Sequence, residues 1–306
     1  MFFRNLTLYR LPTPWNMDLA KLEEMLARNP FTRCSGSEQQ RSGWISPRDK
    51  GSLVYAQNRQ WLIALCTEQR LLPSSVIQDE VRERAEALEE QQGYAPGRKQ
   101  LRELKDRVAE ELLPRAFTRR RTTFVWIDPV NGWLAVDASA LSKAEEVLEQ
   151  LRMVLDDFPL SLVHTKLSPS SAMADWLAGG EAPVNFTVDR DCELKAVGEE
   201  KAAVRYVRHP LDGDGIASEI KAHLAAGKLP TRLALTWNDR ISFVLTERLE
   251  IKRLGFLDLL MEEAEKNTEH AEEKFDADFA LMTGELARFI PSLLDALGGE
   301  VVEDRA

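Results

Sequence analysis

The chain has 306 residues, of which 44% are hydrophobic, and a formal net charge of −10 at pH 7. This length and composition are typical of a globular protein with two or three compact units. The net charge argues against a protein that coats nucleic acid with its whole surface, but it allows one that concentrates positive charge in one place.

Positive charge is concentrated in residues 98–121, which hold nine Lys and Arg against four Asp and Glu, a balance of +5. The rest of the chain therefore sums to −15, because −10 minus +5 is −15. An acidic exterior with one confined basic surface would let DNA approach from one direction only.

Several features indicate a cytoplasmic protein. No apolar run approaches the eighteen or so residues that span a bilayer, so we expect no membrane segment. The opening MFFRNLTLYRL alternates and carries two arginines, which favours a strand over a signal peptide. Three scattered cysteines suit a reduced compartment, and no spacing of Cys and His indicates zinc, so we expect no metal and no cofactor.

The first third of the chain mixes strand and helix patterns. Alternation predicts a strand over Phe2–Leu11, and helical spacing predicts a helix over Asp18–Arg28 with Asp18 as its N-cap. The segments Gly51–Tyr55 and Gln60–Cys66 resemble a hairpin that turns at Asn58.

Two charged segments follow, Ile77–Gln92 and Arg98–Leu113, separated by a glycine- and proline-containing turn at residues 93–97. Their short connection predicts an antiparallel helical hairpin that projects from the body. Each helix has a thin apolar stripe, so the hairpin is either an insertion or an arm that needs a partner arm.

The remaining elements complete a mixed class. We expect a hairpin of Thr122–Ile127 and Trp133–Val136, with its turn at residues 128–132. The other expected elements are helices at Leu141–Leu155, Ser170–Leu177, Gly215–Ala226, Gly255–Glu265 and Phe275–Leu297, the last interrupted near Pro291, and strands at Cys192–Val197, Ala203–Val207, Leu229–Trp237 and Arg240–Glu247. The predicted class is α+β, with mixed antiparallel sheets and helices.

The stretch LLPRAFTRRR, residues 112–121, is the first candidate for function. It joins the charged helices to the strand at Thr123–Ile127 and surrounds Phe117 with Arg115, Arg119, Arg120 and Arg121. Arginines can pair with phosphates while an exposed ring meets a base or a sugar. The alternative is a solvated loop whose Phe117 packs into the core.

A second basic cluster is RYVRHP, residues 205–210, which again combines cations, an aromatic ring and a proline. Its alternative is an edge strand that arginine protects from pairing. Neither cluster shows a recognition helix or a zinc finger, so any contact with DNA should be mainly to phosphates and indifferent to sequence.

The sequence gives little support for an enzymatic function. The chain has no GxxxxGK[ST] loop for ATP hydrolysis and no recognisable nucleophile arrangement. Asp276, Asp278 and Glu285 could serve a metal-dependent nuclease. Asp276 and Asp278 stand two apart near a helix start, however, where capping and the helix dipole explain them.

Three stretches carry a family resemblance: MFFRNLTLYRL, LLPRAFTRRRTTFVWIDPVNGWLAVDA and KFDADFALMTGELARFIPSLLDALGGE. Through these stretches the chain resembles RdgC, the bacterial recombination-associated DNA-binding family, and the resemblance extends over the whole chain. The resemblance implies a horseshoe-shaped subunit of three parts that closes with a second copy into a ring around duplex DNA. It also implies restraint of RecA-mediated strand exchange in recombination and replication-fork repair, without catalysis and near the nucleoid.

The resemblance also implies how the chain divides. A central body would comprise residues 1–75 and 115–165, a helical tip residues 76–114, and a base residues 166–306. Phe117 of the PRAF segment, and Arg208 and His209 after the base strand, would be gate or DNA contacts. The full set of expected DNA-binding residues is Arg98, Lys99, Arg115, Phe117, Arg119, Arg120, Arg121, Arg205, Arg208 and His209.

The expected partners are double-stranded DNA, with single strands possible, and a second copy of the chain, with RecA as a functional antagonist. One rival function is an acidic adaptor that binds RecA or another repair protein directly. Another is the metal-dependent nuclease.

Overall fold

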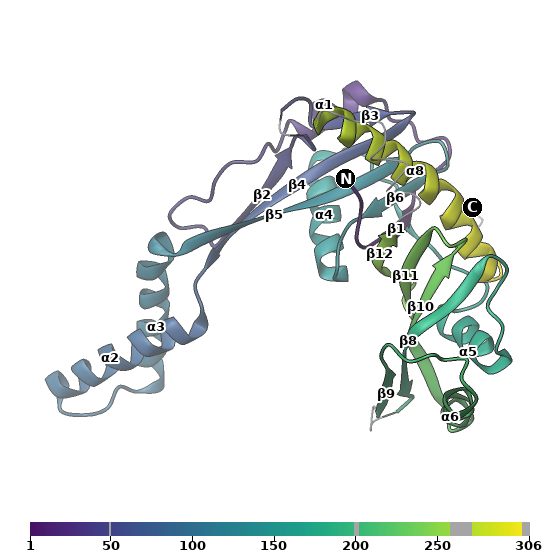
Figure 1. Ribbon diagram of the computed structural model, residues 1–306. Helices are drawn as coiled ribbons and strands as arrows, with labels where there is room; N and C mark the ends of the chain where they lie inside the picture. Colours follow the sequence, from purple (N-terminus) through teal and green to yellow (C-terminus); the bar gives the residue numbers. More distant parts are fainter. Residues whose placement is uncertain (49, 199–201, 258–270, 302–306) are drawn as a thin grey trace.

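The computed structural model describes residues 1–48, 50–198, 202–257 and 271–301. It contains two antiparallel sheets with helices packed on them, which confirms the predicted α+β class. In Figure 1 the chain forms a curved molecule, with a helical hairpin at one end and the second sheet at the other. No helix among these residues is long and apolar enough to cross a membrane.

The first sheet has the strand order β2-β4-β5-β6-β1-β7, with β3 also paired to β4. Its helices α1 (Leu19–Leu26) and α4 (Leu141–Val154) contribute to one core, and the Asp18 side chain caps α1 as predicted. The strands are β1 (Thr7–Arg10), β2 (Gln40–Ile45), β3 (Val54–Gln57), β4 (Gln60–Leu71), β5 (Phe117–Asp128), β6 (Trp133–Val136) and β7 (Ser161–Leu162).

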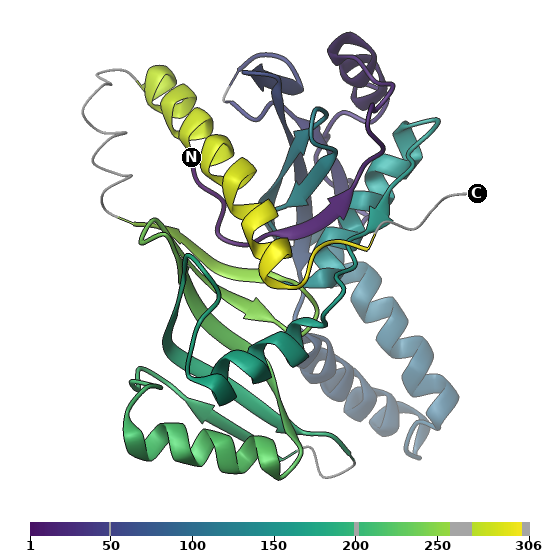
Figure 2. The ribbon, with the colours of Figure 1, turned by 90° about the vertical axis from the view of Figure 1, so that its right-hand side faces the viewer.

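The second sheet has the order β12-β11-β10-β8-β9. Helices α5 (Pro169–Gly179) and α6 (Asp214–Ala225) cover one face, and Figures 1 and 2 both place them on the side away from the helical hairpin. The other face, which no helix of the described residues covers, is therefore turned toward the hairpin side; it is called the uncovered face below. The strands are β8 (Phe186–Ala196), β9 (Ala203–Tyr206), β10 (Lys228–Trp237), β11 (Ile241–Thr246) and β12 (Ile251–Phe256).

Helix α8 (Ala271–Ala296) joins the two sheets into one body. Its Phe279 ring lies 5.2 Å from Tyr55 of the first sheet, and its Phe289 ring lies 5.7 Å from Trp237 of the second. Backbone hydrogen bonds between Leu6 and Ile251, at 2.8 and 3.0 Å, add a direct link.

The helical hairpin consists of α2 (Ser74–Gln92) and α3 (Arg98–Leu112), as predicted. Helix α2 has no buried residue, and α3 buries Val108 alone. Figure 1 shows the hairpin extending from the end of the β4–β5 ribbon, away from both cores. It gains little from hydrophobic burial within one subunit.

Three predictions about elements are wrong or fall partly outside the described residues. Helix α8 continues through Pro291, because burial of Leu293 and Leu294 outweighs the hydrogen bond that proline cannot donate. Gly255 and Phe256 belong to β12 and not to a helix, and residues 258–265 of that predicted helix lie outside the described residues. Strand β5 begins at Phe117, well before the expected start.

Candidate nucleic-acid interface

The first basic cluster lies on a strand. Because β5 pairs with β4 along its whole length, Phe117 stands opposite Leu71, Arg119 opposite Gln69 and Arg120 opposite Glu68. Side chains alternate across a strand, so Phe117, Arg119 and Arg121 share the face that also carries α4, and Arg120 lies on the other. The sheet thus divides the three arginines of β5 between its two faces, and Arg115 lies in the 3-10 helix that precedes the strand.

Phe117 is 84% exposed, so the alternative in which it packs into the core is wrong. Its cross-strand neighbour Leu71 is 47% exposed, and the two form an apolar pair at the end of the ribbon. A large ring this exposed lacks the stabilisation that burial would provide, so Phe117 and Leu71 are candidates for an external contact.

The arginines of this cluster differ in their partners. The guanidinium of Arg120 donates from Nε to Glu68 Oε1 at 2.8 Å, and Arg121 donates to Glu146 Oε2 at 3.1 Å. Arg115 and Arg119 are exposed, and neither forms an ion pair with any described residue. These two have the most freedom to meet an external anion.

Arg98 and Lys99 open α3 and are exposed, with Lys99 Nζ lying 3.9 Å from Glu103. Helix α3 has 15 residues, and at 1.5 Å per residue this places them about 22 Å from the strand cluster. The structure does not bring them together with Phe117.

The second cluster lies on the uncovered face of the second sheet. Arg205 of β9 is exposed, whereas its neighbour Tyr206 faces the core. The Glu193 carboxylate accepts from Arg205 Nε, from Lys195 Nζ at 2.9 Å and from Thr231 Oγ1 at 2.9 Å. Burial opposes ionisation of Glu193, but these hydrogen bonds outweigh it and hold its pKa at about 2.

Arg208 and His209 are exposed beyond the end of β9. Strand β9 stops at Tyr206, and Arg208 has a left-handed backbone with φ of 57°. Its amide donates to Asp191 Oδ1 at 2.8 Å, and Arg253 donates to Asp191 Oδ2 at 2.8 Å. These bonds, that from the Arg208 amide first, lower the pKa of Asp191.

The sequence interpretation missed two arginines of this surface. Arg232 of β10 stands opposite Glu193, and Arg253 of β12 lines the same small hollow of about 140 Å³ as Arg205. Arg232 alternates with the core residue Leu233, so the strand pattern contained a signal for it. The bulged, left-handed backbone at Arg253 left no comparable pattern.

The capping explanation for Asp276 and Asp278 is wrong, because α8 already includes Ala271 and both residues lie beyond its first turn. The three carboxylates that suggested a nuclease each pair with a different cation. Asp276 pairs with Arg48, Asp278 with the amino group of Met1, and Glu285 with Arg240. These pairs attach α8 to both sheets. Among the described residues, no group of three His, Cys, Asp or Glu is arranged to hold a metal ion.

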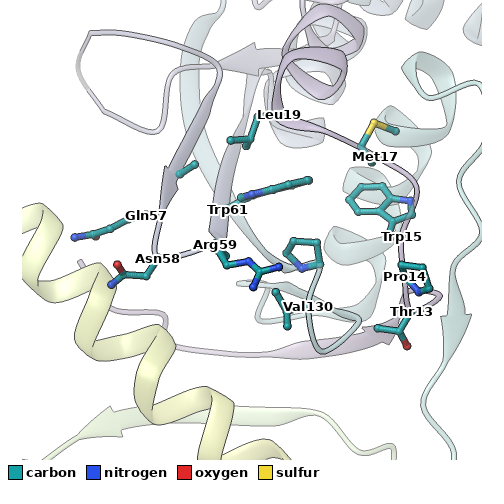
Figure 3. Close-up of a pocket in the computed structure, with 12 residues that line it drawn as sticks. Thr13, Pro14, Trp15, Met17, Leu19, Gln57, Asn58, Arg59, Trp61 and Val130 are labelled. Atoms are coloured by element: carbon teal, nitrogen blue, oxygen red, sulfur yellow. The ribbon is translucent and has the colours of Figure 1, made fainter.

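A hollow of about 630 Å³ lies at the opposite end of the first sheet, at the β3–β4 turn (Figure 3). Trp15, Trp61 and Pro14 give it apolar walls, and Arg59 is its one charged lining residue. It offers neither a pair of titratable groups nor a cluster of cations. The two basic clusters are therefore the better candidates for a functional surface.

Comparison with known proteins adds an independent result. A family model described as "Putative exonuclease, RdgC" matches residues 1–300. A "Recombination-associated protein RdgC" from Dechloromonas aromatica (strain RCB) is 71% identical over 303 residues, which are 99% of each chain. Relatives of the same name from Janthinobacterium sp. (strain Marseille) and Cupriavidus pinatubonensis (strain JMP 134 / LMG 1197) are 51% and 52% identical, over 98% of this chain and 99% of each relative.

Proposed function

The chain belongs to the RdgC family, and from this premise we propose that it is a sequence-independent DNA-binding protein without enzymatic activity. In this proposal two horseshoe-shaped subunits form a ring that encloses duplex DNA. The ring restrains RecA-mediated strand exchange during recombination and replication-fork repair, and the protein is associated with the nucleoid.

One observation carries the proposal. In a chain of net charge −10, exposed arginines lie on both faces of the β5 ribbon and on the face of the second sheet that is turned toward the hairpin side (Figure 1). Phosphate contacts from strand faces carry no sequence information, which suits binding without sequence preference. The chain outside residues 98–121 has a net charge of −15, so the rest of its surface would on balance repel DNA.

The helical hairpin supports a dimer. Val76, Tyr94 and Leu101 of the α2–α3 hairpin are exposed, and neither sheet covers them. A second copy could bury these side chains, so the hairpin would serve as the tip contact. Residues 166–306 would form the base that makes the other contact, and residues 1–75 with 115–165 the body between them.

Enclosure would explain restraint of RecA without a direct contact between the two proteins. A duplex held inside a closed ring is sterically unavailable to a growing filament. Release would require an interface to open, so modest local contacts would give a long residence time.

Salt dependence of DNA binding tests the proposal. The variant Arg115→Gln, Arg119→Gln and Arg121→Gln removes three exposed cations and leaves the buried carboxylate Glu68 paired with Arg120. If each arginine contacts one phosphate, the slope of log affinity against log salt should fall in magnitude by about 2.7.

The double variant Arg28→Gln and Arg59→Gln is a control for loss of positive charge elsewhere, because these exposed arginines lie outside both clusters. Its slope should equal that of the parent protein. An unchanged slope in the triple variant would remove the β5 ribbon from the interface. The ring itself predicts that circular DNA survives a salt challenge that releases linear DNA of the same length.

The rival functions give different outcomes. A metal-dependent nuclease using Asp276, Asp278 and Glu285 would degrade DNA in the presence of Mg²⁺, whereas we expect the DNA to stay intact. An acidic adaptor would retain RecA from an extract treated with nuclease, with no DNA bridge, and would bind purified DNA only weakly.

A further inference from the structure

The two basic clusters differ in sequence but share one arrangement of side chains. In each, a glutamate stands directly opposite an arginine on the neighbouring strand: Glu68 faces Arg120 across β4–β5, and Glu193 faces Arg205 across β8–β9. The glutamates are almost fully buried, at 2% and 4% exposure. The arginine side chains above them are 46% and 65% exposed.

In both pairs the contact is made through the inner nitrogen of the guanidinium group. Arg120 and Arg205 each donate from Nε to the buried carboxylate. Among the described residues, the terminal nitrogens of these two arginines form no hydrogen bond or ion pair. A planar guanidinium held at Nε has a fixed orientation and keeps its outer two nitrogens for a second anion.

The carboxylates are themselves fixed by other donors. Glu68 Oε2 accepts from the Cys34 amide at 2.6 Å, and Glu193 Oε1 accepts from Lys195 and Thr231. The Cys34 amide first, and Arg120 second, lower the pKa of Glu68, and the pKa of Glu193 is about 2. Both groups are therefore anionic at neutral pH.

Charge alone would make these glutamates a disadvantage in a DNA-binding surface, since each adds a negative charge beneath a phosphate contact. Orientation of the arginine would instead favour DNA binding. An arginine without a partner loses side-chain conformational entropy when it binds a phosphate, whereas one already held by a glutamate loses less. If charge dominates, removing the carboxylate charge should increase the affinity for DNA; if orientation dominates, it should decrease the affinity.

We propose that Glu68 and Glu193 are positioning residues for DNA binding, each fixing its cross-strand arginine so that the outer guanidinium nitrogens meet a phosphate. This inference rests on the proposed DNA-binding function. Arg120 and Arg205 are phosphate contacts in addition to the other exposed arginines, and the two glutamates act only through these two.

The test compares Glu68→Gln and Glu193→Gln with Glu149→Gln, measuring affinity for a duplex at constant salt and thermal unfolding of each protein. Glu149 is an exposed residue of α4 whose carboxylate pairs with no described cation, so it reports the effect of charge alone. We expect Glu149→Gln to bind equally or up to about threefold more tightly. Glu68→Gln and Glu193→Gln should bind about tenfold more weakly, although they too lose a negative charge.

A double-mutant cycle locates the effect. In an Arg205→Ala background, Glu193→Gln should cause no further loss, because the residue through which it acts is gone. A full tenfold loss in that background would overturn the inference, and so would tighter binding by the two single variants.

The variants Arg120→Lys and Arg205→Lys test the same idea if the glutamine proteins fail to fold. They conserve charge and leave the carboxylates paired, but they replace the oriented fork with a flexible point charge. We expect about fivefold weaker binding, and parent-like binding would overturn the inference. A parent protein that fails to bind DNA at all would instead refute the proposed function, so the two failures are distinguishable.

Discussion

Phe117→Ala separates a binding role from a structural one. The ring is 84% exposed, so about 16% of a surface of roughly 200 Å² is buried in the subunit, or about 30 Å². At about 25 cal/mol per Å², its removal should cost less than about 1 kcal/mol of unfolding free energy. If the ring stacks on DNA, the same change should cost about 1–3 kcal/mol of binding free energy, or about fivefold to 150-fold in affinity.

Two measurements on the purified protein check this prediction. Urea unfolding gives the stability change, and duplex binding over a range of salt concentrations gives affinity and slope. The slope should stay unchanged, because phenylalanine neutralises no phosphate. Val184→Ala, at an equally exposed apolar residue, is the control and should change neither quantity. A loss of several kcal/mol in stability, or an unchanged affinity, would refute the reasoning.

Two further predictions concern buried charge and the hairpin junction. The pKa of Glu193 is about 2, below its ordinary 4.5, so its stabilising contribution is complete above about pH 4.5 and is lost as pH falls toward 2. We expect this loss, about 2 kcal/mol after allowance for solvent screening, in urea unfolding between pH 5 and 2, and a flatter profile in Glu193→Gln. Arg70 donates to the carbonyls of Leu113, Pro114 and Ala116 at 3.1–3.2 Å, so Arg70→Ala should raise the exchange of the backbone amides of residues 113 and 115–117 about tenfold. The control Arg59→Ala should leave this exchange unchanged.

The sequence predicted best the elements whose signals are local. The cap at Asp18 and the hairpin turning at Asn58 depend on neighbouring residues, and Asn58 and Arg59 have the positive φ values, 52° and 63°, of a tight turn. The start of β5 depends instead on pairing with β4, far away in the chain. Its first residues are exposed on both faces, so no apolar alternation marks them as a strand.

The candidate site was predictable in composition but not in arrangement. Clustered arginines beside Phe117 are visible in the sequence, whereas the burial of Glu68 and Glu193 depends on strand register. A glutamate within a predicted strand is expected to face solvent unless its cross-strand partner is known. Arg253 was not predicted as a site residue for a related reason, because a bulge and not a regular strand directs it to the surface.

If the proposed DNA binding holds, the buried glutamates also explain how the chain can carry clustered arginines before DNA is present. Cations crowded on one strand repel one another, and the repulsion is strongest where protein replaces water on one side. An anion beneath Arg120 offsets part of that repulsion without occupying the outer surface that a phosphate would need. An exposed glutamate would provide the same compensation but would compete with the phosphate for the guanidinium. In the proposed function, burial of the carboxylate, and not its charge alone, would therefore keep the basic surface of an acidic chain both stable and open to DNA.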